Sequence, residues 1–290
     1  MIVLGLDTST PATTVALRLT DRSVGEARDD PPAGGRPGHA TRLLELADGL
    51  LADAGLGWRA LDRIAVGLGP GTFTGLRVGV ATARGLAQSL AVDLVGVSSP
   101  RALAYAALRA SAGSTAGEPP AAGAGAARAG EPPAAGAGVG AAGEPEPAAA
   151  GVIAVIDARR GEVFAAAYVA GEGGEGPRAL TPPRALAPGE LGAVLAQARR
   201  ERGDAGGDAP EGAGGWLAVG DGALRYRGEL ERAGLRVPVE RSPLHLLSAA
   251  AVCELGVRAP AQKIQAIVPD YGRRPDAELA LEGAGAQGAC

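Results

Sequence analysis

Two aspartates stand where a protein could hold a metal ion and a phosphate. Asp7 follows the apolar run 2–6, and Asp157 follows the similar run 152–156. Each run predicts a buried strand that ends in a turn, so each carboxylate is expected at a strand-to-turn corner. Aspartate also favours turns for its own hydrogen bonds, and this structural role is the favoured interpretation for Asp157. After Asp7, residues 8–10 (Thr-Ser-Thr) replace the glycine usual in such nucleotide sites and leave less room for phosphate.

The glycine-rich stretch 67–77 lies between a predicted strand and a predicted helix, where backbone amides could bind an anion. It is not a P-loop, because Leu76 follows Gly75 where a lysine is required. It also lacks the third glycine of a dinucleotide-binding motif, and Phe73 takes the place of the serine of a nucleophile elbow. The stretch therefore completes none of these three motifs.

Candidate nucleophiles and metal ligands are few. The two histidines, His39 and His245, are far apart and have no carboxylate or thiol at the spacing of a metal site. His39 precedes the first predicted helix and is expected to cap or pack, and Cys253 is expected in the core. A serine–histidine–aspartate arrangement built from distant residues stays open. We predict no catalytic residue, no metal site and no cofactor.

The elements that position these residues alternate between strand and helix patterns. A strand, a helix and a second strand in succession predict a parallel βαβ unit with a right-handed crossover. The strand–aspartate–turn–strand pattern occurs twice and predicts two similar lobes rather than one sheet. The expected strands are 2–6, 13–19, 63–68, 94–97, 152–157, 162–169 and 216–219, and the expected helices are 39–54, 76–90, 191–202, 223–233 and 244–255.

Composition narrows the class of protein. With 46% hydrophobic but only 3% aromatic residues among 290, the core must be built from Leu, Val, Ile and Ala. A formal net charge of −4 argues against independent binding of nucleic acid, which needs a basic surface. Two cysteines are too few for a disulfide framework. We recognise no secretion signal and no membrane-spanning run, so we expect a cytoplasmic protein.

Low-complexity sequence separates the two halves. The segment 117–125 recurs at 130–138, and proline and glycine at this density cannot bury enough apolar surface to fold. We predict a disordered Ala/Gly/Pro-rich insertion at 111–150 and a second flexible stretch at 203–215. The predicted domains are an N-terminal lobe at 1–110, the insertion at 111–150, and a C-terminal lobe with a flexible tail at 151–290.

Three segments carry a resemblance to a known family: residues 2–10, residues 69–79 (Gly-Pro-Gly-Thr-Phe-Thr-Gly-Leu-Arg-Val-Gly) and residues 156–164. They resemble TsaB, also called YeaZ, over roughly residues 1–110 and 151–170. The resemblance implies an α/β fold of two actin-like lobes (ASKHA, a duplicated RNase H-like fold). It also implies a role in making threonylcarbamoyladenosine beside the anticodon of tRNAs.

In that system TsaB is the partner subunit and not the transferase. The resemblance implies that the chain pairs with TsaD, which carries the active site, and meets the P-loop ATPase TsaE through the complex. Contact with tRNA would be only indirect, and no membrane is involved. A homodimer of the chain alone stays open. The absence of a P-loop and of a histidine pair from this sequence agrees with a non-catalytic subunit.

The expected partner surface lies on the helices at 40–54 and 76–90. Small residues recur every four positions on the second helix, which lets another helix approach closely, either within this chain or from a partner. The predicted interface residues are Leu43, Leu46, Leu50, Gly75, Gly79, Ala83 and Ala87. Replacing Gly79 with leucine is expected to weaken pairing and leave the fold largely intact. The alternatives are an independent actin-like ATPase or sugar kinase that uses Asp7 and Asp157, and a peptidase with a site built from distant residues.

Overall fold

The computed structural model describes residues 1–32, 35–112, 149–172, 175–203 and 215–272. Most of the predicted insertion at 111–150, most of the predicted flexible stretch at 203–215 and the tail at 273–290 lie outside these residues. Within the described ranges, none of the helices combines the length and the apolar character that crossing a bilayer requires.

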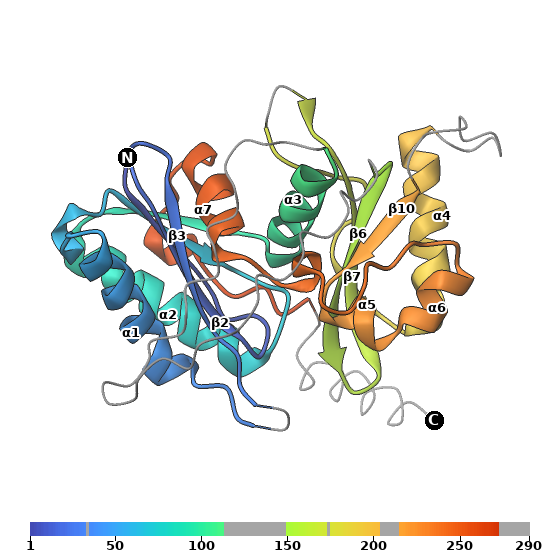
Figure 1. Ribbon diagram of the computed structural model, residues 1–290, viewed down its shortest axis with the longest axis horizontal. Helices are drawn as coiled ribbons and strands as arrows, with labels where there is room; N and C mark the ends of the chain where they lie inside the picture. Colours follow the sequence, from blue (N-terminus) through green and yellow to red (C-terminus); the bar gives the residue numbers. More distant parts are fainter. Residues whose placement is uncertain (33–34, 113–148, 173–174, 204–214, 273–290) are drawn as a thin grey trace, which may run out of the picture.

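A mixed sheet forms the first lobe, with strand order β3-β2-β1-β4-β5 (Figure 1). Its central strand β1 pairs antiparallel with β2 and parallel with β4. Both faces of this sheet are covered, which explains why β1 is buried along its whole length. The strands are β1 (Val3–Asp7), β2 (Thr13–Arg18), β3 (Val24–Asp29), β4 (Arg63–Gly67) and β5 (Asp93–Val97).

Helices α1 (His39–Asp53) and α2 (Phe73–Leu90) cover one face of this sheet, and α7 (Ala249–Arg258) covers the other. Successive side chains of a strand point to opposite faces. Leu4 accordingly packs in the core beneath α1 and α2, whereas Val3 packs in the core beneath α7.

The second lobe repeats the plan of the first, with strand order β10-β6-β7-β8 and β9 also paired to β7. Its strand β6 pairs antiparallel with β7 and parallel with β10, as β1 does with β2 and β4. The predicted α/β fold with two similar lobes is confirmed. The elements are β6 (Gly151–Arg159), β7 (Glu162–Val169), β8 (Arg178–Ala179), β9 (Arg184–Leu186), β10 (Trp216–Val219), α3 (Ser99–Ser111), α4 (Leu191–Arg202), α5 (Asp221–Arg225) and α6 (Arg227–Arg232).

Two helices cross between the lobes. Helix α3 follows the last strand of the first sheet, yet it packs on β6 and β7 of the second sheet. Helix α7 comes late in the chain, inside the predicted C-terminal lobe at 151–290, yet it packs on β1, β2 and β4. The two helices contact each other and lie between the sheets (Figure 1). One boundary in the sequence therefore divides the strands of the two sheets, but it does not assign each helix to the sheet on which it packs.

Several element boundaries differ from the prediction. Helix α2 begins at Phe73 rather than at Leu76. The prediction started too late because Gly75, a poor helix former, lies in the first turn. The predicted helix at 244–255 begins only at Ala249, where the Ser248 side chain accepts a hydrogen bond from the Ala251 amide. The predicted helix at 223–233 is two short helices, α5 and α6.

Candidate functional site

The glycine-rich stretch wraps tightly around the turn that follows Asp7. The Thr72 amide donates to the Ser9 carbonyl over 2.7 Å, and the Thr8 hydroxyl donates to the Gly75 carbonyl over 2.7 Å. A Cβ atom placed on Gly71 would overlap the Ser9 backbone, and one placed on Gly75 would overlap the Thr8 carbonyl oxygen. These glycines are needed for close packing of one backbone segment on another. The space that a phosphate group would need is filled by the protein itself.

Both carboxylate oxygens of Asp7 accept hydrogen bonds. One oxygen accepts from the Ser9 amide over 2.7 Å and the other accepts from the Ser99 hydroxyl over 2.6 Å. The side chain has no exposed surface, and burial raises its pKa, although the hydrogen bonds from Ser9 and Ser99 act in the opposite direction. No local pattern pointed to Ser99 as the partner of Asp7, because it lies 92 residues away on α3.

Asp157 has different surroundings in the second lobe. Its carboxylate accepts from the Arg159 amide over 3.0 Å and pairs with the Arg225 guanidinium over 2.9 Å. The Asp221 carboxylate accepts in turn from the Asp157 amide over 3.0 Å, and burial raises the pKa of Asp221. The favoured structural interpretation of Asp157 agrees with these contacts. Asp7 and Asp157 belong to separate hydrogen-bond networks.

A cavity of about 260 Å³ lies between the lobes, and neither Asp7 nor Asp157 lines it. Three carboxylates, those of Asp30, Asp221 and Glu240, line it together with the single arginine Arg28. That guanidinium is already engaged, because it donates to Asp30 over 2.7 Å and to the Leu247 carbonyl over 2.9 Å. An excess of carboxylates repels the phosphates of a nucleotide. Among the residues that line this cavity, no unpaired guanidinium is therefore available for the phosphates of a free nucleotide.

The two histidines lie in different lobes and make different contacts. His39 Nδ1 lies 2.8 Å from the Thr13 hydroxyl, whereas His245 lies between the carbonyls of Gly220 and Pro238. Burial lowers the pKa of both imidazoles. Across the described ranges, no three His, Cys, Asp or Glu side chains come together as a metal ion would require.

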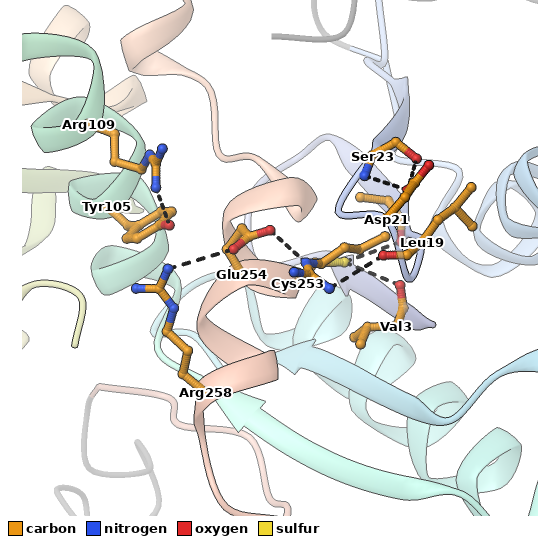
Figure 2. Close-up of polar contacts among 11 residues, drawn as sticks. Val3, Leu19, Asp21, Ser23, Tyr105, Arg109, Cys253, Glu254 and Arg258 are labelled. Carbon is orange, nitrogen blue, oxygen red and sulfur yellow. Dashed lines mark hydrogen bonds and ion pairs between the residues drawn. The ribbon is translucent and has the colours of Figure 1, made fainter. Parts of the chain in front are cut away.

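Helix α7 contributes structural contacts rather than a reactive thiol. The Cys253 thiol is fully buried and donates weakly to the carbonyls of Val3 and Ala16, as Figure 2 shows for Val3. Burial raises the pKa of this thiol, so it stays protonated and unreactive. The prediction that Cys253 lies in the core is confirmed. The next residue, Glu254, pairs with Arg18 over 2.7 Å and so links α7 to β2.

Most of the predicted partner residues are buried within this chain. Leu46 and Leu50 are half-buried, but the other five pack in the core between α1, α2 and the sheet: Leu43, Gly75, Gly79, Ala83 and Ala87. A Cβ on Gly79 would overlap the Thr8 hydroxyl, so the expectation that leucine at this position spares the fold is wrong. The small residues serve close packing inside the chain. The surfaces of α1 and α2 that remain open to a partner are their opposite sides.

Comparison with known proteins shows what this chain is similar to. A solved structure described as an uncharacterized protein with similarity to peptidase YEAZ from Pseudomonas aeruginosa superposes with a TM-score of 0.63 at 26% identity. The superposition covers 94% of this chain and 99% of that one. In sequence and in fold, the chain resembles the TsaB (YeaZ) family.

Curated proteins show the same resemblance. The TsaB protein of Haemophilus influenzae is 40% identical over 107 residues, which cover 37% of this chain and 43% of the relative. The TsaB protein of Escherichia coli is 30% identical over 174 residues, which cover 60% of this chain and 58% of the relative. The chain thus spans about half the length of the curated relatives it matches. A family model described as TsaD, tRNA N6-adenosine threonylcarbamoyltransferase, matches residues 32–130.

An exposed aromatic group marks the open side of α2. Phe73 is 56% exposed, the Tyr271 ring stacks on it at 4.9 Å, and the Arg77 guanidinium lies 4.6 Å from the Phe73 ring centre. Leu44 on α1 is 44% exposed. Aromatic and arginine side chains of this kind dominate the binding energy of many protein interfaces. The pairing of Tyr271 with Phe73 joins segments almost 200 residues apart, and no local sequence pattern predicts it.

Proposed function

We propose that this chain is a non-catalytic subunit in the biosynthesis of threonylcarbamoyladenosine on tRNA, and that it acts by pairing with the transferase TsaD. The observation that carries the proposal is the closed glycine-rich loop. In a fold that in other proteins holds nucleotide phosphates, residues 67–75 pack on the turn at residues 8–10 instead. The TsaB relatives are named as tRNA threonylcarbamoyladenosine biosynthesis proteins, which supports this pathway. The match of residues 32–130 to the TsaD model is consistent with a partner of related fold.

The partner would dock on the open sides of α1 and α2. This surface includes Leu44 and the aromatic group of Phe73, Arg77 and Tyr271. A stable pairing buries about 1,200–2,000 Å² in total, which is compatible with two adjacent helices. TsaE would join through TsaD, tRNA contact would be indirect, and the complex would act in the cytoplasm. The chain alone could use the same surface to form a homodimer.

A matched pair of variants tests this surface. Leu44→Asp places a charge on the open side of α1, and Val239→Asp places one on the second lobe at a side chain that is 73% exposed. Because both sites are exposed, neither change should alter the fold. We expect Leu44→Asp to weaken binding to TsaD by about 2 kcal/mol or more, and Val239→Asp to leave binding unchanged.

Calorimetry with TsaD from the same organism, followed by a tRNA threonylcarbamoylation assay, measures both effects. Equal binding by the two variants would show that the partner docks elsewhere. Tight binding of ATP and magnesium by the isolated chain would instead revive the ATPase alternative.

A further inference from the structure

His39 joins three elements of the first lobe. It is the first residue of α1, it is only 5% exposed, and its Nδ1 atom meets the hydroxyl of the fully buried Thr13 on β2. Its other ring nitrogen, Nε2, is buried and has no hydrogen-bond partner within the described residues. One side of the imidazole is therefore satisfied and the other is not.

The unpaired nitrogen faces the first turn of α2. A Cβ on Gly75 would lie 3.1 Å from His39 Nε2 and 2.6 Å from the Thr72 hydroxyl oxygen. Thr72 occupies the N-cap position of α2, but its side chain makes no capping bond and has no partner among the residues that the structure describes. Two buried polar atoms thus approach the same point. The absence of a side chain at Gly75 allows the α1 histidine and the α2 cap to come this close.

This site suits an uncharged ring. A protonated imidazole has two N–H donors and needs two acceptors, and Thr13 offers one hydroxyl oxygen. The amino end of α2 carries a partial positive charge, which repels a cation. The nearest compensating charge is Asp29 on β3, but Arg42 on α1 donates to that carboxylate over 3.1 Å and also pairs with Glu45. Burial lowers the pKa of His39 more than Asp29 raises it.

We propose that His39 positions α1 against α2, and that its protonation disturbs this arrangement so that pairing with the transferase weakens as the pH falls. The proposal rests on the proposed function, because α1 and α2 carry the proposed docking surface. A partner that holds the two helices in the observed arrangement favours the uncharged ring. Protons and partner then compete, with a limit of about tenfold in affinity per pH unit for one proton.

The test compares the two histidines, which are the only ones in the chain. Binding to TsaD is measured from about pH 7.5 to about pH 5.5 for the wild type, His39→Gln and His245→Gln. Glutamine keeps one donor and one acceptor but cannot titrate. We expect the wild type and His245→Gln to lose severalfold in affinity over this range, and His39→Gln to lose much less. The loss stays below about tenfold because burial lowers the pKa of His39 in the free chain. Equal pH dependence in all three proteins would overturn the proposal.

A second measurement needs no partner. Nitrogen-edited NMR spectra of the isolated chain should show two imidazole titrations, assigned by the loss of one signal in His245→Gln. We expect the amide signals at the start of α1 and in the first turn of α2 to shift together with the titration of His39. If these amides stay unchanged while His39 titrates, the positioning role is refuted. A chain that shows these shifts but binds no TsaD at any pH would refute the proposed function instead.

Discussion

The two lobes contain the same strand–aspartate–turn–strand unit, but they surround the aspartate in opposite ways. In the first lobe, Asp7 is sealed among hydroxyl and amide donors by the glycine-rich loop. In the second, Asp157 is paired with Arg159 and Arg225, whose side chains are more than half exposed. The two lobes thus share a backbone arrangement, but the side chains around the aspartate at the end of the first strand differ between them. In both copies the carboxylate is engaged by neighbouring groups of the chain.

The glycine-rich loop of the first lobe is where a small change should have the largest effect. Gly75→Ala places a methyl group against the Thr8 carbonyl, whereas Gly85→Ala on the same helix meets no atom within 4 Å. We expect Gly75→Ala to lower the free energy of unfolding by about 3 kcal/mol through overpacking. Gly85→Ala should raise it by up to about 1 kcal/mol through helix propensity. Urea denaturation of both variants measures the difference, and equal stabilities would show that the loop does not pack as described.

The two aspartates give the next largest contrast. Asp7→Ala leaves the Ser99 hydroxyl and the Ser9 amide unsatisfied in a buried site, which should cost about 3 kcal/mol. Asp157→Ala removes ion pairs to guanidinium groups that are 52% and 55% exposed, so solvent screening limits the cost to about 1 kcal/mol. Thermal and urea unfolding measure both values. A larger loss for Asp157→Ala would mean that the second lobe, and not the first, depends on its aspartate.

The smallest effect is expected at two helix caps. The Ser248 side chain accepts from the Ala251 amide over 3.3 Å and donates to Glu26 over 3.0 Å, whereas the Thr72 side chain caps nothing. Ser248→Ala should therefore cost about 1 kcal/mol, and Thr72→Ala should cost less. Hydrogen exchange at the first turns of α7 and α2 separates the two. A larger effect at Thr72 would show that its hydroxyl is engaged after all.

Local patterns in the sequence predicted most of the strands and helices. These patterns did not predict the elements whose position depends on contacts with distant parts of the chain. Strand β3 (Val24–Asp29) has little apolar character, and its place is set by pairing along β2. Helix α3 begins with Ser99 and Pro100 and is rich in alanine. Its local sequence could not show that it packs on the second sheet rather than on the first.

In the candidate site too, local sequence predicted the element but not what it packs against. The recurrence of Gly75, Gly79, Ala83 and Ala87 correctly indicated a helix with one closely packed face. It could not show whether that face meets a partner or the chain itself, because small residues permit either contact. The answer depends on the turn at residues 8–10, which is more than 60 residues away in the sequence.

The central proposal is that this chain acts by pairing with TsaD. The most direct test is a tRNA threonylcarbamoylation assay with TsaD and TsaE from the same organism, run without the chain, with the wild type, and with Leu44→Asp or Val239→Asp. We predict activity only when the chain is present, a strong loss with Leu44→Asp and full activity with Val239→Asp. Full activity in the absence of the chain would contradict the account.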